Sequence, residues 1–245
     1  MRILGIIPAR YESSRFPGKP LIDLKGKTMI QRVYEGAKKS KLLTDLIVAT
    51  DDERIVDEVL SFGGKVAMTS SFHTTGTDRC AEILHAYKDQ YDVVINIQGD
   101  EPLVDAQQLD QLLEAFNNPN VQIATLASRS ISMEDILNPN RIKVVISKNQ
   151  EALYFSRSPT PNFNHSKGDP LSSYPYLRHI GLYAFTAQTL VEITQLEETK
   201  LEKIESLEQL RWLYNGYSIS VIETEIETPN IDAPEDVEKV LSLLV

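Results

Sequence analysis

Short apolar runs alternate with amphipathic segments along the first half of the chain. Ile3–Ile7 is apolar apart from Gly5, which is typical of a strand buried on both faces of a sheet. Four later runs have the same character: Leu46–Ala49, Lys65–Met68, Val93–Ile97 and Val121–Ala127. Helical spacing of apolar residues marks the segments between them: Thr28–Lys39, the residues after Asp51-Asp52, Thr77–Tyr87 and Asp105–Phe116. Repeated strand–helix alternation predicts an α/β fold with a doubly wound, mostly parallel sheet.

The pattern changes in the middle of the chain. Ile142–Ser147 and Ala152–Ser156 are β-rich and separated by a short polar turn, which predicts a hairpin, and Ser158–Tyr176 is rich in Pro, Ser and Asn, which predicts a long irregular loop. Four elements are expected after it: a strand over Leu177–Ala184, a helix over Leu201–Trp212, a strand over Ile219–Glu223 and a closing helix over Pro234–Leu244. We therefore expect one domain over residues 1–245 with a β-rich insertion near residues 140–185.

Composition is that of a folded, acidic protein. The chain has 245 residues, 42% of them hydrophobic, and a formal net charge of −10. This is enough for one substantial core, and the acidic balance disfavours a broad nucleic-acid surface without excluding a local nucleotide site. Cys80 is the single cysteine, expected in the core, and the sequence has neither a signal-peptide pattern nor an apolar stretch of membrane-spanning length. We expect a cytoplasmic protein without membrane insertion.

A basic loop follows the first strand. Pro8–Pro20 brings Arg10, Arg15 and Lys19 close together in sequence, with Gly18 beside the lysine. A loop at the carboxyl end of a parallel strand lies where open α/β sheets place ligands, and its cations and amides suit a triphosphate. The loop is neither a Walker A motif nor a Rossmann fingerprint. An ordinary exposed loop remains the alternative on composition alone.

Two further motifs supply carboxylates. Asp100 follows the strand Val93–Ile97 in the string NIQGDEP, where a carboxylate can hold Mg²⁺ against substrate phosphates, although Gly-Asp before Pro is also common turn chemistry. Asp232 stands in IDAPEDVE and can be a second ligand, although capping of the closing helix is the simpler interpretation of this motif by itself.

A fourth motif, HTTGTDR, precedes the helix Thr77–Tyr87. Its hydroxyls and amides suit the sugar or base of a nucleotide, whereas Thr77 as a plain helix cap is the simpler alternative. The four histidines are scattered and show no zinc-ligand spacing.

Taken together, these motifs resemble the 3-deoxy-manno-octulosonate cytidylyltransferases (CMP-Kdo synthetases). Nine strings occur in the family's order over nearly the whole chain: IIPARYESSRFPGKPL, VATDDERI, HTTGTDR, NIQGDEP, NPNRIKVV, ALYFSRSPTP, LRHIGLYAF, LEQLR and IDAPEDVE. Each string is weak alone, but nine in order are highly specific. The resemblance implies a nucleotide-diphospho-sugar transferase-like fold, a homodimer and a place in lipopolysaccharide synthesis.

The implied reaction joins CTP and the sugar acid Kdo to give CMP-Kdo and pyrophosphate, with Mg²⁺ as cofactor. The resemblance assigns the nucleotide to Ala9, Arg10, Arg15, Lys19, Thr69, Ser71, Gly76, Thr77 and Gln98, and the metal to Asp100 and Asp232. It assigns the sugar to Gln98, Arg157, His179, Glu208 and Gln209, with Arg157 as the partner of the sugar carboxylate. Arg15, Lys19, Asp100 and Asp232 are the expected catalytic residues.

Three alternatives stay open from the sequence. A close analogue such as 8-amino-Kdo is another candidate acceptor, because the loop after Arg157 varies in the family. A CMP-sialic acid synthetase is disfavoured by the strings ALYFSRSP and LRHIG. A non-catalytic nucleotide-binding regulator would have no need for both Asp100 and Asp232.

Overall fold

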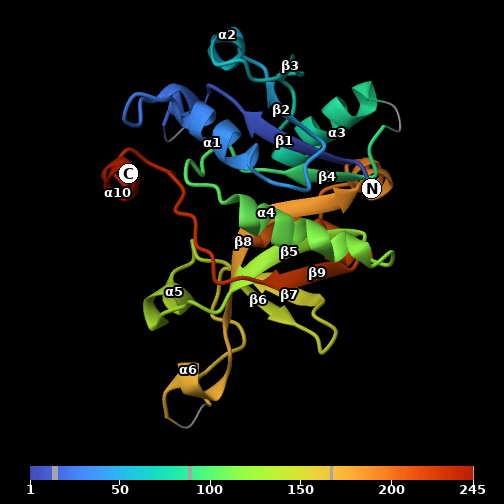
Figure 1. Cartoon of the computed structure of the whole chain (residues 1–245). Helices are drawn as coiled ribbons and strands as arrows, with labels where there is room; N and C mark the ends of the chain where they lie inside the picture. Colours follow the sequence, from blue (N-terminus) through green and yellow to red (C-terminus); the bar gives the residue numbers. More distant parts are fainter. Residues whose placement is uncertain (13–15, 88–89, 166–167, 245) are drawn as a thin grey trace.

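The structure is a computed structural model of the 245-residue chain, and it describes residues 1–12, 16–87, 90–165 and 168–244. Its centre is one sheet with the strand order β3-β2-β1-β4-β8-β5-β9, and β6 adds to β8 and to β7 (Figure 1). The strands are β1 (Ile3–Ala9), β2 (Asp45–Thr50), β3 (Val66–Met68), β4 (Val93–Asn96), β5 (Ile123–Ser128), β6 (Lys143–Ile146), β7 (Ala152–Ser156), β8 (Leu177–Thr186) and β9 (Ile219–Glu223).

The pairing is mostly parallel, as predicted. β1 pairs in parallel with β2 and β4, β2 with β3, and β5 with β9. β8 lies between β4 and β5 and runs antiparallel to both. The predicted hairpin is confirmed, since β6 and β7 pair in antiparallel register.

Helices cover both faces of the sheet, so the doubly wound prediction is confirmed. One apolar cluster joins the sheet to α1 (Met29–Ala37), α2 (Glu53–Ser61), α4 (Ala106–Leu113) and α10 (Asp236–Leu243). The other joins it to α3 (Gly76–Ala86), α7 (Ala187–Ile193) and α9 (Gln209–Tyr214), and it contains the fully buried Cys80. β1 serves both clusters, because Ile3 and Ile7 point to one face while Leu4 and Ile6 point to the other.

The helix predicted over Leu201–Trp212 is two helices. α8 (Lys200–Glu205) ends at Ser206, whose φ of 51° is left-handed, and α9 starts at Gln209. Leu207 between them is buried in the second cluster, so tertiary packing of this residue accompanies the break in the helical pattern.

Four short elements go beyond the sequence-based prediction. They are α5 (Met133–Leu137), α6 (Pro170–Ser173) within the predicted irregular loop, α7, and the 3-10 turn Lys19–Leu21. Figure 1 shows α6 at the far end of an extended segment below the sheet, and the β6–β7 hairpin beneath β5 and β9. Within the described ranges, no helix combines the length and the apolar character needed to cross a membrane.

Candidate active site

The carboxyl ends of β1 and β4 lie side by side because the two strands are parallel neighbours. Their following loops touch at Gly99, where a Cβ atom would lie 2.6 Å from the carbonyl oxygen of Pro8. Only glycine allows so close an approach between the two backbones. The basic loop and the NIQGDEP string therefore meet at one end of the sheet, as the sequence analysis expects for a ligand site.

A backbone hydrogen bond joins the two ends of the basic loop. The Gly18 amide donates to the Tyr11 carbonyl at 2.9 Å, and Gly18 has a φ of +73°, which favours glycine. The guanidinium of Arg54 lies 3.3 Å from the centroid of the Tyr11 ring and is held by Asp52, the N-cap of α2. Arg15 lies outside the described residues.

Lys19 joins three distant parts of the chain. Its ammonium donates to Asp100 Oδ2 and to the carbonyl oxygen of Ile231, both at 2.9 Å. The Ile231 amide also donates to the carbonyl of Asp100 at 2.9 Å. Asp232 is thereby held one residue from this contact, and its Oδ2 accepts a hydrogen bond from Asn230. The alternative role of Asp232 as a helix cap is not observed, since Glu235 is the N-cap of α10 and Asp236 accepts from the Asp232 amide.

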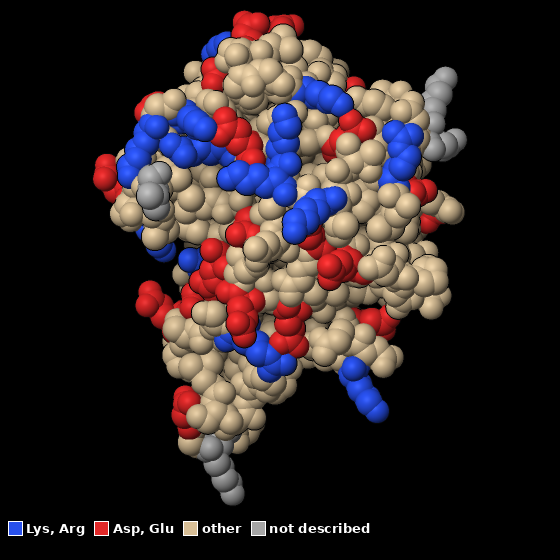
Figure 2. Space-filling view, in the orientation of Figure 1, with Lys and Arg blue, Asp and Glu red and all other residues tan. Residues whose placement is uncertain are grey.

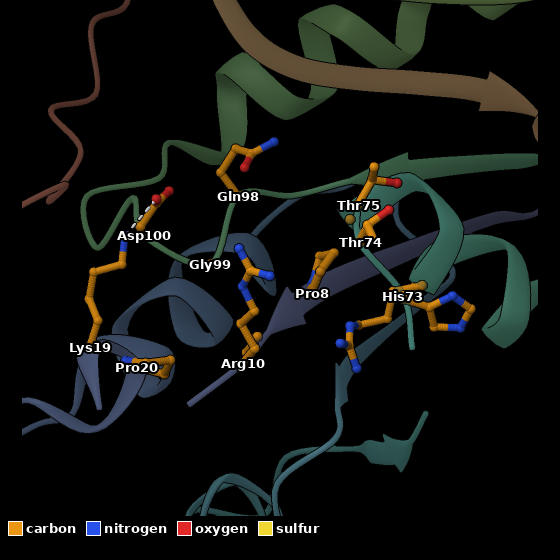
Figure 3. A pocket seen from close by; sticks show the side chains of 13 residues that line it. Pro8, Arg10, Lys19, Pro20, His73, Thr74, Thr75, Gln98, Gly99 and Asp100 are labelled. Carbon is orange, nitrogen blue, oxygen red and sulfur yellow. Dashed lines mark hydrogen bonds and ion pairs between the residues drawn. The ribbon is translucent and has the colours of Figure 1, made fainter. Parts of the chain in front are cut away.

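These loops enclose a first cavity of about 250 Å³. Figure 3 shows Lys19 and Asp100 meeting on one side of it, Thr74, Thr75 and His73 on the other, and Arg10, Pro8 and Gly99 between them. The lining is Pro8, Ala9, Arg10, Lys19, Pro20, His73, Thr74, Thr75, Gly76, Arg79, Gln98, Gly99 and Asp100. The cationic residues Arg10, Lys19 and Arg79 therefore border a space together with one carboxylate, an arrangement suited to a nucleoside triphosphate.

Three predicted nucleotide residues do not line this cavity. Thr69 is buried and donates to the Thr50 carbonyl, Ser71 is exposed, and Thr77 donates to Glu208 at 2.9 Å. Thr75, not Thr77, caps α3 by accepting from the Asp78 amide. Thr77 instead lies within the first turn of the helix, so the simple capping interpretation of that residue is wrong.

A second cavity of about 330 Å³ opens beside the first. Gln98 and Asp100 line both, and Gln98 Nε2 is oriented by the Gly181 carbonyl at 2.7 Å. The remaining lining is Glu101, Asn140, Arg141, Ile142, Arg178, His179, Ile180, Gly181, Tyr183, Leu207, Gln209, Thr228 and Asn230. Two ligand spaces thus share a wall, which places a group bound in one next to a group bound in the other.

The predicted sugar residues divide into two groups. His179, Gln209 and Gln98 line the second cavity. Arg157 does not: its guanidinium donates to the backbone carbonyls of Pro139, Glu205 and Ser206. Among the described residues, the arginines that do line the cavity are Arg141 and Arg178, which sequence reasoning left without a role although both stand in quoted strings.

The comparisons with known proteins agree with this geometry. A family model described as cytidylyltransferase matches residues 4–224. The chain belongs to the cytidylyltransferase family. The 3-deoxy-manno-octulosonate cytidylyltransferase of Parabacteroides distasonis is 53% identical, over 100% of this chain and 98% of that protein. The protein of the same name from Phocaeicola vulgatus is 51% identical with the same coverage.

A solved structure extends the likeness to three dimensions. CMP:2-keto-3-deoxy-manno-octonic acid synthetase complexed with CTP is 42% identical and aligns with a TM-score of 0.92, covering 99% of this chain and 98% of that one. The fold class predicted from the sequence is therefore confirmed, and the cytidylyltransferase described here is a nucleotidyltransferase enzyme.

The chemistry of Asp100 fits a magnesium ion: it lines both cavities, whereas Asp232 is not among the lining residues of either. No three His, Cys, Asp or Glu side chains in the described ranges converge as a ready-made cage. Mg²⁺ in nucleotide sites needs only one or two carboxylates, with waters and phosphate oxygens as its other ligands. Asp100, with Asp232 one residue beyond the Ile231–Asp100 backbone bond, supplies such a pair from two distant parts of the chain.

Basic side chains gather over part of one face of this acidic protein. Figure 2 shows Lys and Arg side chains mainly over the upper half of one face, with Asp and Glu among and below them.

Burial lowers the pKa of His179 to about 3, with Arg178 adding to the effect, so the imidazole is neutral near pH 7. One His179 ring nitrogen pairs with the Thr125 hydroxyl at 3.0 Å. A neutral imidazole so held suits hydrogen bonding to a sugar hydroxyl rather than charge pairing.

Glu208 is not among the described residues that line either cavity. Its Oε2 accepts from Thr77, and its neighbours in sequence, Leu207 and Gln209, line the second cavity. Burial raises the pKa of Glu208 to about 7, against the hydrogen bond from Thr77, which lowers it. This carboxyl therefore links α3, which borders the first cavity through Gly76 and Arg79, to the segment that borders the second cavity.

Glu208→Gln is expected to stabilise the protein more at pH 8 than at pH 5. The folded state holds a proton on Glu208 that the unfolded chain releases above its ordinary pKa of 4.5, so stability is lost as pH rises from there through about 7. Glutamine keeps an acceptor for Thr77 and removes this cost, a relative gain of about 2 kcal/mol at pH 8. Urea unfolding at both pH values measures it.

Glu198→Gln is the matched control, because Glu198 makes an exposed ion pair with Lys203 and should change stability little at either pH. An equal effect of Glu208→Gln at pH 5 and pH 8 would contradict the assignment of a raised pKa to this carboxyl.

Proposed function

We propose that this cytidylyltransferase transfers the cytidylyl group of CTP to Kdo, giving CMP-Kdo and pyrophosphate. The observation that carries the proposal is the pair of cavities that share Gln98 and Asp100, the first lined by cations such as Arg10 and Lys19 and the second by polar side chains such as His179 and Gln209. The printed names of the relatives and the CTP complex of the solved neighbour support the same substrates.

The first cavity holds the triphosphate in this proposal. Arg10 and Lys19 neutralise its charge and that of the departing pyrophosphate, with Arg15 assigned to the same task from its place in the basic loop. Asp100 and Asp232 would hold Mg²⁺, which would supply electrophilic polarisation of the phosphate oxygens when bound. The C2 hydroxyl oxygen of the sugar bonds to the α-phosphorus, and the bond from that phosphorus to the pyrophosphate oxygen breaks, with the hydroxyl proton released.

The second cavity holds the sugar acid. Gln98, His179 and Gln209 line it and bind sugar hydroxyls in this proposal. The carboxylate partner proposed here is Arg178, with Arg141 beside it in the lining. The Arg178 guanidinium pairs with Glu227 at 2.7 Å, whereas Arg157, expected in this role, is not among the lining residues and donates to three backbone carbonyls.

The finer attributes follow from the family resemblance. We propose a Mg²⁺-dependent homodimer in the cytoplasm that supplies activated Kdo for lipopolysaccharide synthesis. 8-Amino-Kdo is the alternative acceptor, since it shares the carboxylate and the C2 hydroxyl that the two cavities would bring to CTP.

Pyrophosphate release tests the proposal directly. CTP should support turnover and UTP and GTP should not, and Kdo should exceed N-acetylneuraminate in kcat/KM by at least about 10³-fold. Chelation of divalent cations should abolish turnover, and added Mg²⁺ should restore it. Turnover with N-acetylneuraminate alone, or CTP binding without any turnover, would overturn the proposed reaction.

A further inference from the structure

Lys143 is a fully buried lysine behind the second cavity. It begins β6, where it pairs with Arg178 of β8 and with Ser156 of β7. Its ammonium donates to three backbone carbonyl oxygens, those of Asn138 at 3.0 Å, Arg141 at 2.7 Å and Arg157 at 2.7 Å. An ammonium group has three N–H donors, so each is used on backbone.

The carbonyls of Asn138 and Arg141 belong to the segment that forms one wall of the cavity. Asn140, Arg141 and Ile142 of this segment line it. Without Lys143, the three part-buried carbonyls would lose a charge-assisted donor, which is costly for polar groups withdrawn from water. Lys143 therefore bonds the backbone of this wall directly.

Arg157 joins the segment 138–142 to a second wall of the cavity, formed by residues 205–209. Its guanidinium donates to Pro139 at 3.0 Å, Glu205 at 2.6 Å and Ser206 at 3.2 Å, all through backbone carbonyls. The Glu205 carboxylate accepts in turn from the Arg157 amide at 2.9 Å and from the Ser156 hydroxyl at 2.8 Å. The left-handed residue Ser206 leads directly into Leu207 and Gln209, which line the cavity.

We propose that Lys143 and Arg157 form one clamp that sets the distance between the two walls of the second cavity and thereby positions the acceptor. Both are positioning residues: they act through the backbone of residues 138–142 and 205–209. The clamp rests on the proposed function in that the second cavity is taken as the acceptor site.

The clamp is specific to the acceptor side of the enzyme. No residue of 138–142 or 205–209 belongs to the lining of the first cavity, as described, whereas five of them line the second. Loosening the clamp should therefore weaken acceptor binding and leave CTP binding intact. A shift of about 1 Å in substrate-positioning groups can cost about 10²-fold in rate.

Steady-state kinetics of Lys143→Met and Lys143→Gln test this, with Kdo and CTP varied in turn. Methionine keeps the length of the side chain and removes its donors, whereas glutamine retains two N–H donors. The expected result is an increase of about tenfold or more in KM for Kdo with methionine, a smaller increase with glutamine, and a KM for CTP within about twofold of wild type.

Arg32→Met is the matched control. Arg32 also donates to backbone carbonyls, those of Leu24 and Lys25, and neither of these residues lines the two cavities. It should lower the thermal midpoint without changing either KM. A folded Lys143 variant with an unchanged KM for Kdo, or with equal increases in both KM values, would overturn the clamp.

The double variant Lys143→Gln/Arg157→Gln tests whether the two residues act as one unit. Because both hold the segment 138–142, the combined increase in KM for Kdo should be smaller than the product of the two single increases. A multiplicative result would show independent roles and refute the single clamp.

If Lys143→Met does not show cooperative unfolding, the KM values of the glutamine variants alone decide whether the clamp is correct. Absence of turnover by the wild-type enzyme with Kdo would refute the proposed function instead.

Discussion

Asp100→Ala is expected to reduce kcat by at least about 10³-fold while the fold stays intact. Asp100 is the carboxylate that lines both cavities, and it accepts the ammonium of Lys19 at 2.9 Å. Removing it takes away the proposed metal ligand at the junction where the α-phosphorus and the attacking hydroxyl would meet. Stabilisation of charge in the transition state is commonly the largest single contribution to such transfers.

The measurement is pyrophosphate release over a series of Mg²⁺ concentrations, with the thermal midpoint as a check of folding. Asp45→Asn is the matched control, because Asp45 also pairs with one lysine, Lys65, but lies at the amino end of β2. It should retain near-normal kcat. Asp100→Asn should resemble Asp100→Ala, since an amide cannot replace the negative charge.

Asp232→Ala is expected to lose most turnover for the same reason. Near-normal activity of either aspartate variant across the Mg²⁺ series would remove that residue from the proposed metal site. If Asp100→Ala alone were inactive, the ion would be held by one carboxylate and by substrate phosphates, an arrangement that Mg²⁺ accepts.

Lys19→Met is expected to lower kcat/KM for CTP by about 10²- to 10³-fold. The Lys19 ammonium faces the cavity that the proposal assigns to the triphosphate and also bonds the Ile231 carbonyl, so it supplies charge and holds the C-terminal segment in place. Loss of one preorganised cation from a transferring phosphate typically costs about this much.

Pyrophosphate release with CTP varied at saturating Kdo measures the effect, and Lys65→Met is the control, since Lys65 makes an exposed ion pair with Asp45. The control should change activity by less than about twofold. A Lys19→Met enzyme that lost thermal stability but kept wild-type kcat/KM would restrict Lys19 to a structural role.

The spacing of apolar residues predicted the helices and strands well where contacts between residues near in sequence define the segment. The strand Ile219–Glu223 has the predicted bounds, and the helix over Thr28–Lys39 begins after Thr28, whose hydroxyl caps the Gln31 amide. Asp52 likewise caps α2. In each case the decisive contacts are between residues near in sequence, so spacing and capping chemistry carry the information.

The same patterns failed where distant contacts decide. Thr75 took the cap that Thr77 was expected to provide, and Thr77 is bonded to Glu208, 131 residues away. The pattern over Leu201–Trp212 is compatible with one helix, but the chain turns at Ser206 and buries Leu207. The spacing of residues predicts neither the hydrogen bond of Thr77 nor the end of α8 at Ser206, because the contacts that decide them come from other parts of the chain.

The sequence by itself determined the α/β class and the family, because the period of the apolar residues and the order of the motifs are properties of the chain read in one dimension. Only the tertiary structure brought Asp100, Lys19 and Ile231 into contact and placed two cavities on either side of Gln98. It also turned Arg157 toward backbone and left Arg141 and Arg178 in the lining. The direction of a side chain depends on which distant carbonyls need a donor, and that is settled only when the chain is folded.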